Sequence, residues 1–132
     1  MMKKFFSLIP LSVGLSLIFF GQILVAKKST AELLEGAKII NRKYPQTHSS
    51  GRFRVDKISV YNQTFRFHYT SFLRNSISEQ KTIFWADVIT RSKMPNLSRV
   101  IYSQGSLRHR YSDSRGNFLF EFIVTPSDLK RF

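Results

Sequence analysis

An apolar run dominates the amino-terminal part of the chain. Residues 5–26 contain no charged side chain, and two lysines stand on either side of them. A helix over this run would rise roughly 33 Å at about 1.5 Å per residue, enough to cross a bilayer core of about 30 Å. The run also has the basic start and apolar middle of a secretory signal peptide. We therefore expect residues 1–26 to be a signal peptide or a transmembrane anchor, and residues 27–132 to form one small basic domain.

The sequence leaves cleavage and orientation of this leader open. Ala26 suits the nearer small position before a signal-peptidase cut, whereas Leu24 suits the farther one poorly, and the run is long for a cleaved signal. The excess of basic residues after the run would keep the domain in the cytoplasm by the positive-inside rule. A short basic tail before an apolar run is nevertheless the usual form of an export signal. We favour an inner-membrane protein with its domain in the periplasm, or a protein secreted to the periplasm if the leader is cleaved.

Charge and cysteine content restrict the kind of partner and of stabilisation. Two of the 21 Lys and Arg residues lie in the leader, so the remaining chain carries 19 against 8 acidic residues, a net charge of +11. Such an excess favours an acidic partner, namely an acidic envelope component, anionic lipid or another envelope protein, although it also keeps a small domain soluble. The chain has no cysteine. Disulfides and the lipid attachment of bacterial lipoproteins are therefore excluded, and the apolar core must hold the domain.

The first half of the domain changes from helical to strand periodicity. Ser29 and Glu32 form a capping-box pattern, which predicts a helix to about Asn41. From residue 53 the apolar period is two, with a slip at Asp56-Lys57 that indicates a bulge or a break. A turn at residues 61–63 leads into the clearest strand, residues 64–73. The two strands are predicted to form an antiparallel hairpin.

The second half repeats this order. A helix is predicted from about Glu79 to Ser92, and a short third helix from Asn96 to Gln104, with Gly105 just past its end. A second hairpin follows, with strands at 107–111 and 118–124, and a short polar tail after Pro126. The order predicts an α+β fold: an N-terminal apolar helix, then a four-stranded antiparallel sheet made of two hairpins, with two or three helices packed on one face.

The candidate catalytic residues are few. If the apolar side of each strand faces the core, His68 and His109 lie on opposite sides of the sheet and cannot share a metal or a proton. We expect His109 to be hydrogen-bonded in the core and His68 to be exposed. Asp87 is expected to pair with Arg91 one helical turn later. No metal-ligand spacing, nucleophile elbow or phosphate-binding loop is found in the sequence. We therefore predict no enzyme activity, no cofactor and no metal.

The polar side of the predicted sheet is the one candidate site. Strand alternation puts five arginines opposite the apolar positions, with Glu121 as the one acidic residue among them: Arg52, Arg54, Arg66, Arg108 and Arg110. Like charges across strands cost some tenths of a kcal/mol per pair, and a bound anion would offset that cost. The alternative is a solvated face that discourages edge-to-edge aggregation. Nucleic acid is disfavoured because Phe65, Phe67 and Tyr69 are committed to the core, which leaves Phe72 as the candidate ring for stacking on bases, and because the apolar leader favours an envelope role.

These features predict a membrane-anchored or exported envelope protein, a binding or accessory module with a basic sheet face for an acidic partner. The alternative is a membrane interaction protein, such as an exclusion, immunity or assembly factor, that acts through its transmembrane helix. Gly14 and Gly21 lie two turns apart on one side of that helix and would permit close helix packing.

Residues 105–126, Gly-Ser-Leu-Arg-His-Arg-Tyr-Ser-Asp-Ser-Arg-Gly-Asn-Phe-Leu-Phe-Glu-Phe-Ile-Val-Thr-Pro, resemble the last third of a group of small exported bacterial proteins of unknown function. In that group a helix, a strand pair, a second helix and a closing strand pair follow a signal sequence, a layout that residues 30–129 share. Its members often carry a cysteine pair, but Lys93-Met94 and Leu129 stand at about those places here. The resemblance implies export and a fold, and it implies no activity.

Overall fold

The computed structural model describes residues 27–131, and the predicted leader at 1–26 lies outside the described residues. Among residues 27–131 no helix is both long and apolar enough to cross a membrane. In chain order the elements are α1 (Thr30–Ile40), the 3-10 helix η1 (Asn41–Lys43), β2 (Gln46–Thr47), β3 (Phe53–Tyr61), β4 (Thr64–Ser71), α2 (Ile77–Ser92), α3 (Pro95–Gln104), β5 (Leu107–Ser112), β6 (Phe118–Val124) and α4 (Pro126–Arg131).

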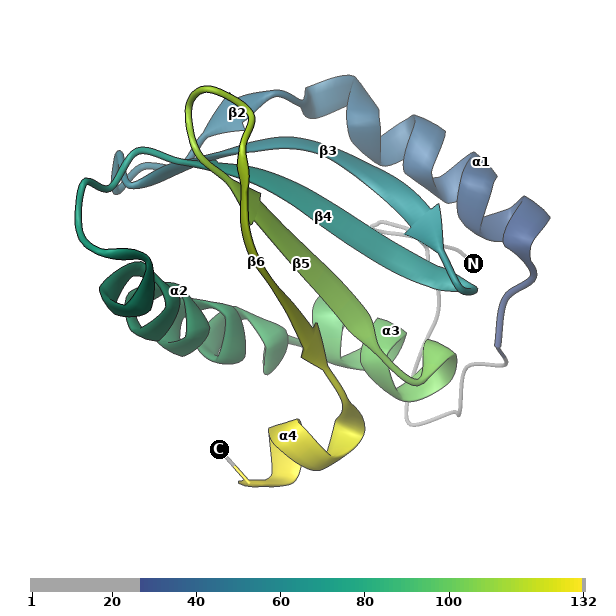
Figure 1. Cartoon of the computed structure of the whole chain (residues 1–132). Coiled ribbons are helices and arrows are strands. Elements are labelled where there is room, and N and C mark those ends of the chain that lie inside the picture. Colours follow the sequence, from purple (N-terminus) through teal and green to yellow (C-terminus); the bar gives the residue numbers. More distant parts are fainter. Residues whose placement is uncertain (1–26, 132) are drawn as a thin grey trace.

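The strands of residues 27–131 form one mixed five-stranded sheet in the order β2-β3-β4-β5-β6 (Figure 1). The β3–β4 and β5–β6 pairs are the antiparallel hairpins expected from the sequence, but β4 and β5 run parallel. The predicted α+β class is confirmed, whereas the purely antiparallel four-stranded sheet is wrong. The reason is the connection: α2 and α3 carry the chain from the end of β4 back to the end where β4 began, and a helical crossover of this kind joins parallel strands.

Two short elements were not expected. Residues Gln46–Thr47 form the edge strand β2, antiparallel to β3, where the sequence predicts a loop. The predicted polar tail after Pro126 is instead the helix α4. It begins because the Asp128 carboxylate accepts hydrogen bonds from the Thr125 amide at 2.9 Å and from the Thr125 hydroxyl at 3.1 Å, which caps the first turn.

The local signals in the sequence position the longer elements. Ser29 and Glu32 form the predicted capping box of α1, and Ser76 with Glu79 forms a second one that starts α2. The predicted bulge lies in β3, where the register with β4 shifts between Val55 and Lys57. Gly105 ends α3 with φ +91°, a left-handed conformation that costs glycine nothing and other residues about 1 kcal/mol or more.

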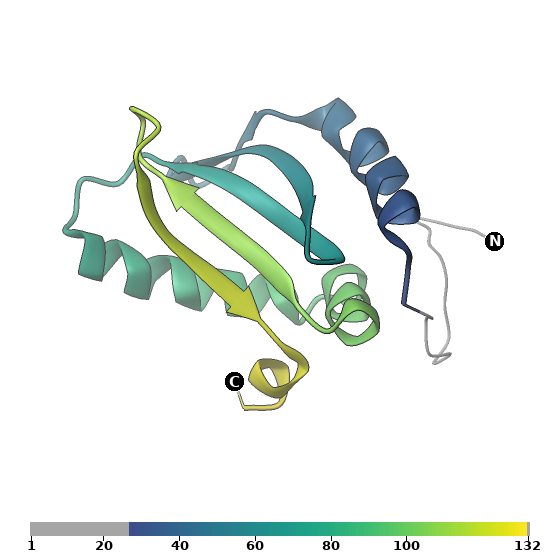
Figure 2. The same ribbon diagram turned by 45° about the vertical axis from the view of Figure 1, so that its right-hand side comes forward.

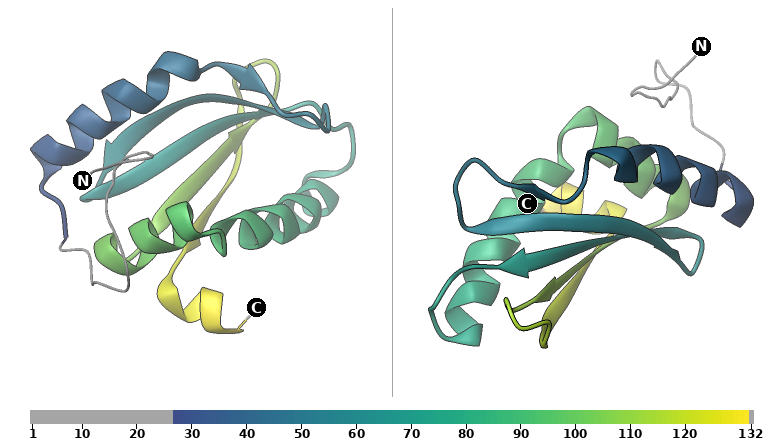
Figure 3. Two further views of the ribbon diagram at one scale, coloured as in Figure 1. Left: turned by 180° about the vertical axis from the view of Figure 1, so that it is seen from behind. Right: turned by 90° about the horizontal axis from the view of Figure 1, so that it is seen from above.

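The helices cover one side of the sheet, here called the helix face, and the opposite side is called the open face. Figure 3 (left) shows α2 and α3 in front of the strands, and Figure 2 shows α1 beside β3 and β4. On the helix face the Phe84 ring of α2 stacks on Tyr111 at 4.5 Å between centroids and meets Phe53 edge-on at 5.7 Å. Alternate residues of all four long strands are buried there, at about 1.5–3 kcal/mol for each large apolar side chain.

A candidate binding surface on the open face

Four of the five predicted arginines lie together on the open face. Arg54 comes from β3, Arg66 from β4, and Arg108 and Arg110 from β5. Their strand neighbours point the other way into the core, and Arg66 lies directly beside Arg108 across the parallel β4–β5 pair. The sheet register therefore brings three strands' guanidinium groups onto one surface.

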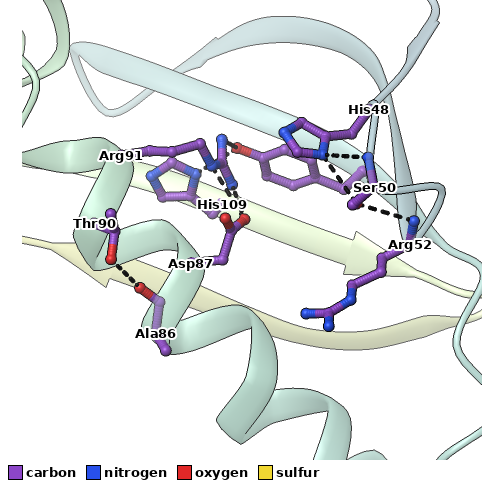
Figure 4. A network of polar contacts seen from close by, with 9 residues as sticks. His48, Ser50, Arg52, Ala86, Asp87, Thr90, Arg91 and His109 are labelled. Carbon is purple, nitrogen blue, oxygen red and sulfur yellow. Dashed lines mark hydrogen bonds and ion pairs between the residues drawn. The ribbon is translucent and has the colours of Figure 1, made fainter.

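Arg52 departs from this group. It precedes β3 and lines a small pocket of about 60 Å³ on the helix side, with Asp87 of α2 and His48 among the other lining residues (Figure 4). The alternation rule places it with Arg54, but the rule applies within a strand, and β3 begins one residue later, at Phe53. Arg52 is therefore not part of the open-face surface.

Glu121 of β6 anchors two of the arginines. Arg66 donates to its carboxylate through Nε at 2.7 Å and Nη2 at 3.2 Å, and the Arg108 Nη1 lies 3.7 Å from the same carboxylate. The Arg66, Glu121 and Arg108 side chains are only 17%, 15% and 18% exposed. A two-pronged, mostly shielded pair of this kind is stronger than an ordinary surface ion pair. The sequence shows Glu121 only as the one acidic residue among the arginines. In the structure its carboxylate holds Arg66 and Arg108 together.

The ring of Tyr61, at the end of β3, supports the same two arginines. The Arg66 guanidinium carbon lies 4.0 Å from the ring centroid and that of Arg108 lies 4.7 Å from it. Tyr61 is nevertheless 42% exposed. Cation–π contacts at such distances are worth about 0.5–1 kcal/mol at exposed sites. They restrain both guanidinium groups beside the Tyr61 ring.

Arg54 is paired separately from the other arginines, with Asp56 and Thr70. Its Nε donates to Asp56 at 2.5 Å and its Nη2 to Thr70 at 3.2 Å, while the Thr70 hydroxyl donates to the other Asp56 oxygen at 2.7 Å. The ring of Phe72, 39% exposed, lies 5.8 Å from the guanidinium carbon. Arg54 is therefore the most neutralised of the four.

The remaining basic side chains form a row across three strands. Lys57 on β3 pairs in register with His68 on β4, and His68 pairs with Arg110 on β5. Glu121 completes the row on β6 but turns its carboxylate toward the neighbouring row. The Arg110 guanidinium instead lies 4.3 Å from the ring centroid of Phe118, which is 52% exposed.

His68 is held within this cationic row. Its Nε2 lies 2.6 Å from the Ser59 hydroxyl, and the side chain is half-buried rather than fully exposed as expected. Partial burial lowers the pKa of His68, and the positive charges of Lys57, Arg66 and Arg110 lower it further, while Glu121 acts in the opposite direction. His68 is therefore neutral at physiological pH and gains a charge only when the solution turns acidic.

The other two sequence predictions about polar side chains concern the helix face, and both are confirmed (Figure 4). His109 is fully buried, with its Nδ1 2.7 Å from the Tyr69 hydroxyl. Arg91 Nη2 lies 3.0 Å from the Asp87 carboxylate, and Arg91 Nη1 donates to the Tyr69 hydroxyl at 3.3 Å. Burial, followed by the charge of Arg91, holds the pKa of His109 well below its usual value, and burial raises the pKa of Tyr69 to about 12.

This buried network has a structural role rather than an open site. His109 and Tyr111 are both 0% exposed, so no substrate can reach them without opening the core. Among residues 27–131 no group of three or more His, Cys, Asp or Glu side chains could hold a metal ion. The accessible charged groups gathered on one surface of the described residues are those of the open face.

Sequence reasoning found Phe72 among the exposed aromatic rings of the open face but missed Tyr61 and Phe118. Strict alternation along residues 118–124 predicts that Phe118 shares the core side with Phe120. The register shifts between Tyr111 and Ser112, however, so Phe118 lies opposite Ser112 and faces outward. Tyr61 could have been found from the slip in β3, because after the bulge the odd residues Lys57, Ser59 and Tyr61 share the open face. Phe65, Phe67 and Tyr69 are buried as expected.

Comparison with known proteins gives a fold. No protein-family model and no curated protein matches the chain. Among solved structures, the pilotin EpsS of the Vibrio vulnificus type 2 secretion system matches with a TM-score of 0.64 at 13% identity, covering 76% of this chain and 90% of that one. A Pseudomonas aeruginosa protein thought to be secreted gives 0.62 at 9% identity, with 76% and 91% covered. The type 2 secretion pilotin AspS of Vibrio cholerae gives 0.59 at 14%, with 75% and 90% covered. The chain thus shares the fold of these three small proteins.

Proposed function

We propose that the chain is a non-catalytic accessory protein of the bacterial cell envelope, which binds another envelope protein through its open face. Two of the solved structures with this fold are pilotins of type 2 secretion systems, and a third is thought to be secreted. The chain covers about nine-tenths of each, so the similarity extends over their whole fold. An apolar leader at residues 5–26 fits delivery to the same compartment.

The observation that carries the proposal is the composition of the open face. Four arginines share it with two carboxylates, those of Asp56 and Glu121, and with exposed aromatic rings at Tyr61, Phe72 and Phe118. Arginine and aromatic side chains are the residues most enriched where proteins bind each other. The excess of positive charge there selects a partner with an acidic surface.

The way in which the titratable side chains of the described residues are used supports a non-catalytic role. His109 is sealed in the core, and Asp87 is paired with Arg91. A general acid or base must reach the substrate proton within hydrogen-bond distance. His68 is the accessible candidate, and its Nε2 lies 2.6 Å from the Ser59 hydroxyl. Its charged neighbours are three cations and Glu121, but among the described residues no carboxylate hydrogen-bonds the imidazole, so the third group that would orient a Ser–His pair is missing.

The experiment that tests this proposal combines fractionation with photocrosslinking in cells. The full chain is expressed in a Gram-negative bacterium with benzoylphenylalanine at Tyr61 or Phe118 on the open face, or at Leu34, an exposed residue of α1, as the control. We expect the chain in the envelope fraction, and adducts with one acidic envelope protein from the two open-face positions. The adduct should decrease in the Arg108→Gln background.

The proposal fails if the chain fractionates with the cytoplasm. It also fails if Leu34 crosslinks while Tyr61 and Phe118 do not, because the contact surface would then be on the helix side.

A further inference from the structure

We propose that an acidic segment of the protein partner places a carboxylate beside Arg110 and His68, in the row formed by Lys57, His68 and Arg110. This inference rests on the proposed function and specifies where within the open face the partner is held and by what chemistry.

The first step is the unequal distribution of negative charge over the surface. In register Glu121 stands directly opposite Arg110, yet its carboxylate is taken up by Arg66 and Arg108. Asp56 is likewise taken up by Arg54 and Thr70. Among residues 27–131 the Arg110 guanidinium has no hydrogen-bond or ion-pair partner, and its contact is the ring of Phe118. The row is therefore the part of the surface where an external anion would complete the charge balance.

The second step is the orientation of Arg110. The guanidinium carbon lies 4.3 Å from the Phe118 ring centroid, a contact that restrains the side chain while leaving its N–H donors without a hydrogen-bond acceptor in residues 27–131. A side chain already held in place loses less entropy on binding than a free one, so its contacts contribute more to affinity. The planar guanidinium group presents N–H donors in pairs that match the two oxygens of a carboxylate.

The third step is that Arg108, next to Arg110 on the same strand, is also incompletely satisfied. Its Nε is buried and has no hydrogen-bond partner among the described residues, and its Nη1 is 3.7 Å from Glu121. A buried donor without an acceptor costs about 1–3 kcal/mol. A partner's carboxylate beside Arg110 would not reach the buried Arg108 Nε, but its negative charge would reduce the repulsion between the two arginines of β5.

The fourth step selects a protein rather than lipid or nucleic acid. Exposed apolar side chains border the row and its neighbour: Phe118 is 52% exposed, Ile123 45% and Tyr61 42%. Such side chains need apolar atoms from the partner beside the carboxylate, and a protein segment supplies both. The Arg66 and Arg108 side chains are less than a fifth exposed, so most of their surface is withdrawn from a planar lipid surface.

The test uses the full chain in detergent micelles and a fluorescent peptide of glutamate and leucine, with a glutamine–leucine peptide as the uncharged counterpart. Binding is followed by fluorescence anisotropy. We expect Arg110→Gln to weaken binding of the glutamate peptide about tenfold, Arg110→Lys to weaken it less because the charge is kept, and the control Arg42→Gln on η1 to change it less than about twofold. Thermal unfolding of each variant verifies the fold.

The inference is overturned if Arg110→Gln binds the glutamate peptide as the native chain does, or if the glutamine peptide binds equally well. Displacement of the peptide by micelles containing phosphatidylglycerol, or by a single-stranded oligonucleotide, at lower concentration than by unlabelled peptide would also overturn it, in favour of lipid or nucleic acid. If crosslinking from Tyr61 and Phe118 persists undiminished in Arg110→Gln cells, the proposed function stands and this inference alone fails.

Discussion

Replacing Glu121 by glutamine should reduce stability and strengthen the binding of an acidic partner at the same time. The carboxylate accepts two hydrogen bonds from Arg66, at 2.7 and 3.2 Å, and lies 3.7 Å from Arg108. Exposed ion pairs contribute about 0–1 kcal/mol, whereas loss of one partner from a buried pair costs about 3–5 kcal/mol. At 15–18% exposure, and with one neutral acceptor retained by glutamine, we expect a loss of about 2 kcal/mol.

Urea unfolding followed by the fluorescence of Trp85, the one tryptophan of the sequence, measures this loss. For a domain of this size about 2 kcal/mol corresponds to a fall in melting temperature of roughly 8–16 °C. Arg66→Gln and the double variant complete a double-mutant cycle, in which we expect a coupling energy of more than about 1 kcal/mol.

Two results would refute this reasoning. A loss below about 0.5 kcal/mol would mean that Glu121 acts as an ordinary surface carboxylate. Weaker binding of the glutamate peptide by a folded Glu121→Gln chain would mean that Glu121 does not compete with an external anion for the arginines.

Three further predictions follow from the same structure. The pKa of His109 is held well below its usual value in the folded chain, so the unfolded chain binds the proton first as the pH falls. The free energy of unfolding should therefore decrease as the pH is lowered from about 6.5 toward 5, by up to about 1.4 kcal/mol per pH unit, and by less in His109→Gln; an equal slope in urea titrations of both chains would contradict it. The pKa of His68 is lowered, so His68 becomes positive, among Lys57, Arg66, Arg110 and Glu121, only as the pH falls through that pKa. The glutamate peptide should then bind more tightly. Anisotropy titrations across this pH range should show the gain in affinity in the native chain and not in His68→Gln. Gly105→Ala should cost about 1 kcal/mol in urea unfolding because φ is +91° there although a Cβ would meet no atom within 4 Å, and a neutral result would refute strain as the reason for glycine.

Local patterns predicted the elements of this domain well because the deciding interactions are local. The capping box at Ser29, the bulge near Asp56 and the glycine stop at Gly105 each depend on a few consecutive residues. The direction of β5 relative to β4 was not predictable in this way. It depends on how α2 and α3 pack back across the sheet, which no short segment encodes.

For the candidate surface, too, local patterns predicted some features and tertiary geometry decided the others. Alternation placed Arg54, Arg66, Arg108 and Arg110 on one face, because side-chain direction within a strand has a fixed period. It failed at Arg52, which stands outside β3, and at Phe118, which a register shift turns outward. The pairing of Glu121 with Arg66 rather than with its direct neighbour Arg110 is a matter of tertiary geometry. That pairing decides which arginine is left for a partner.

Photocrosslinking from Phe118 in living cells, with charge variants on both sides of the sheet, tests the central claim most directly. We expect one adduct with an acidic envelope protein. It should be lost in the Arg108→Gln, Arg110→Gln double variant and retained in the Arg42→Gln, Lys81→Gln double variant, which removes the same charge from η1 and α2, away from the open face. An adduct that survives the first pair of changes, or that disappears equally with the second, would contradict a partner held by the arginines of the open face.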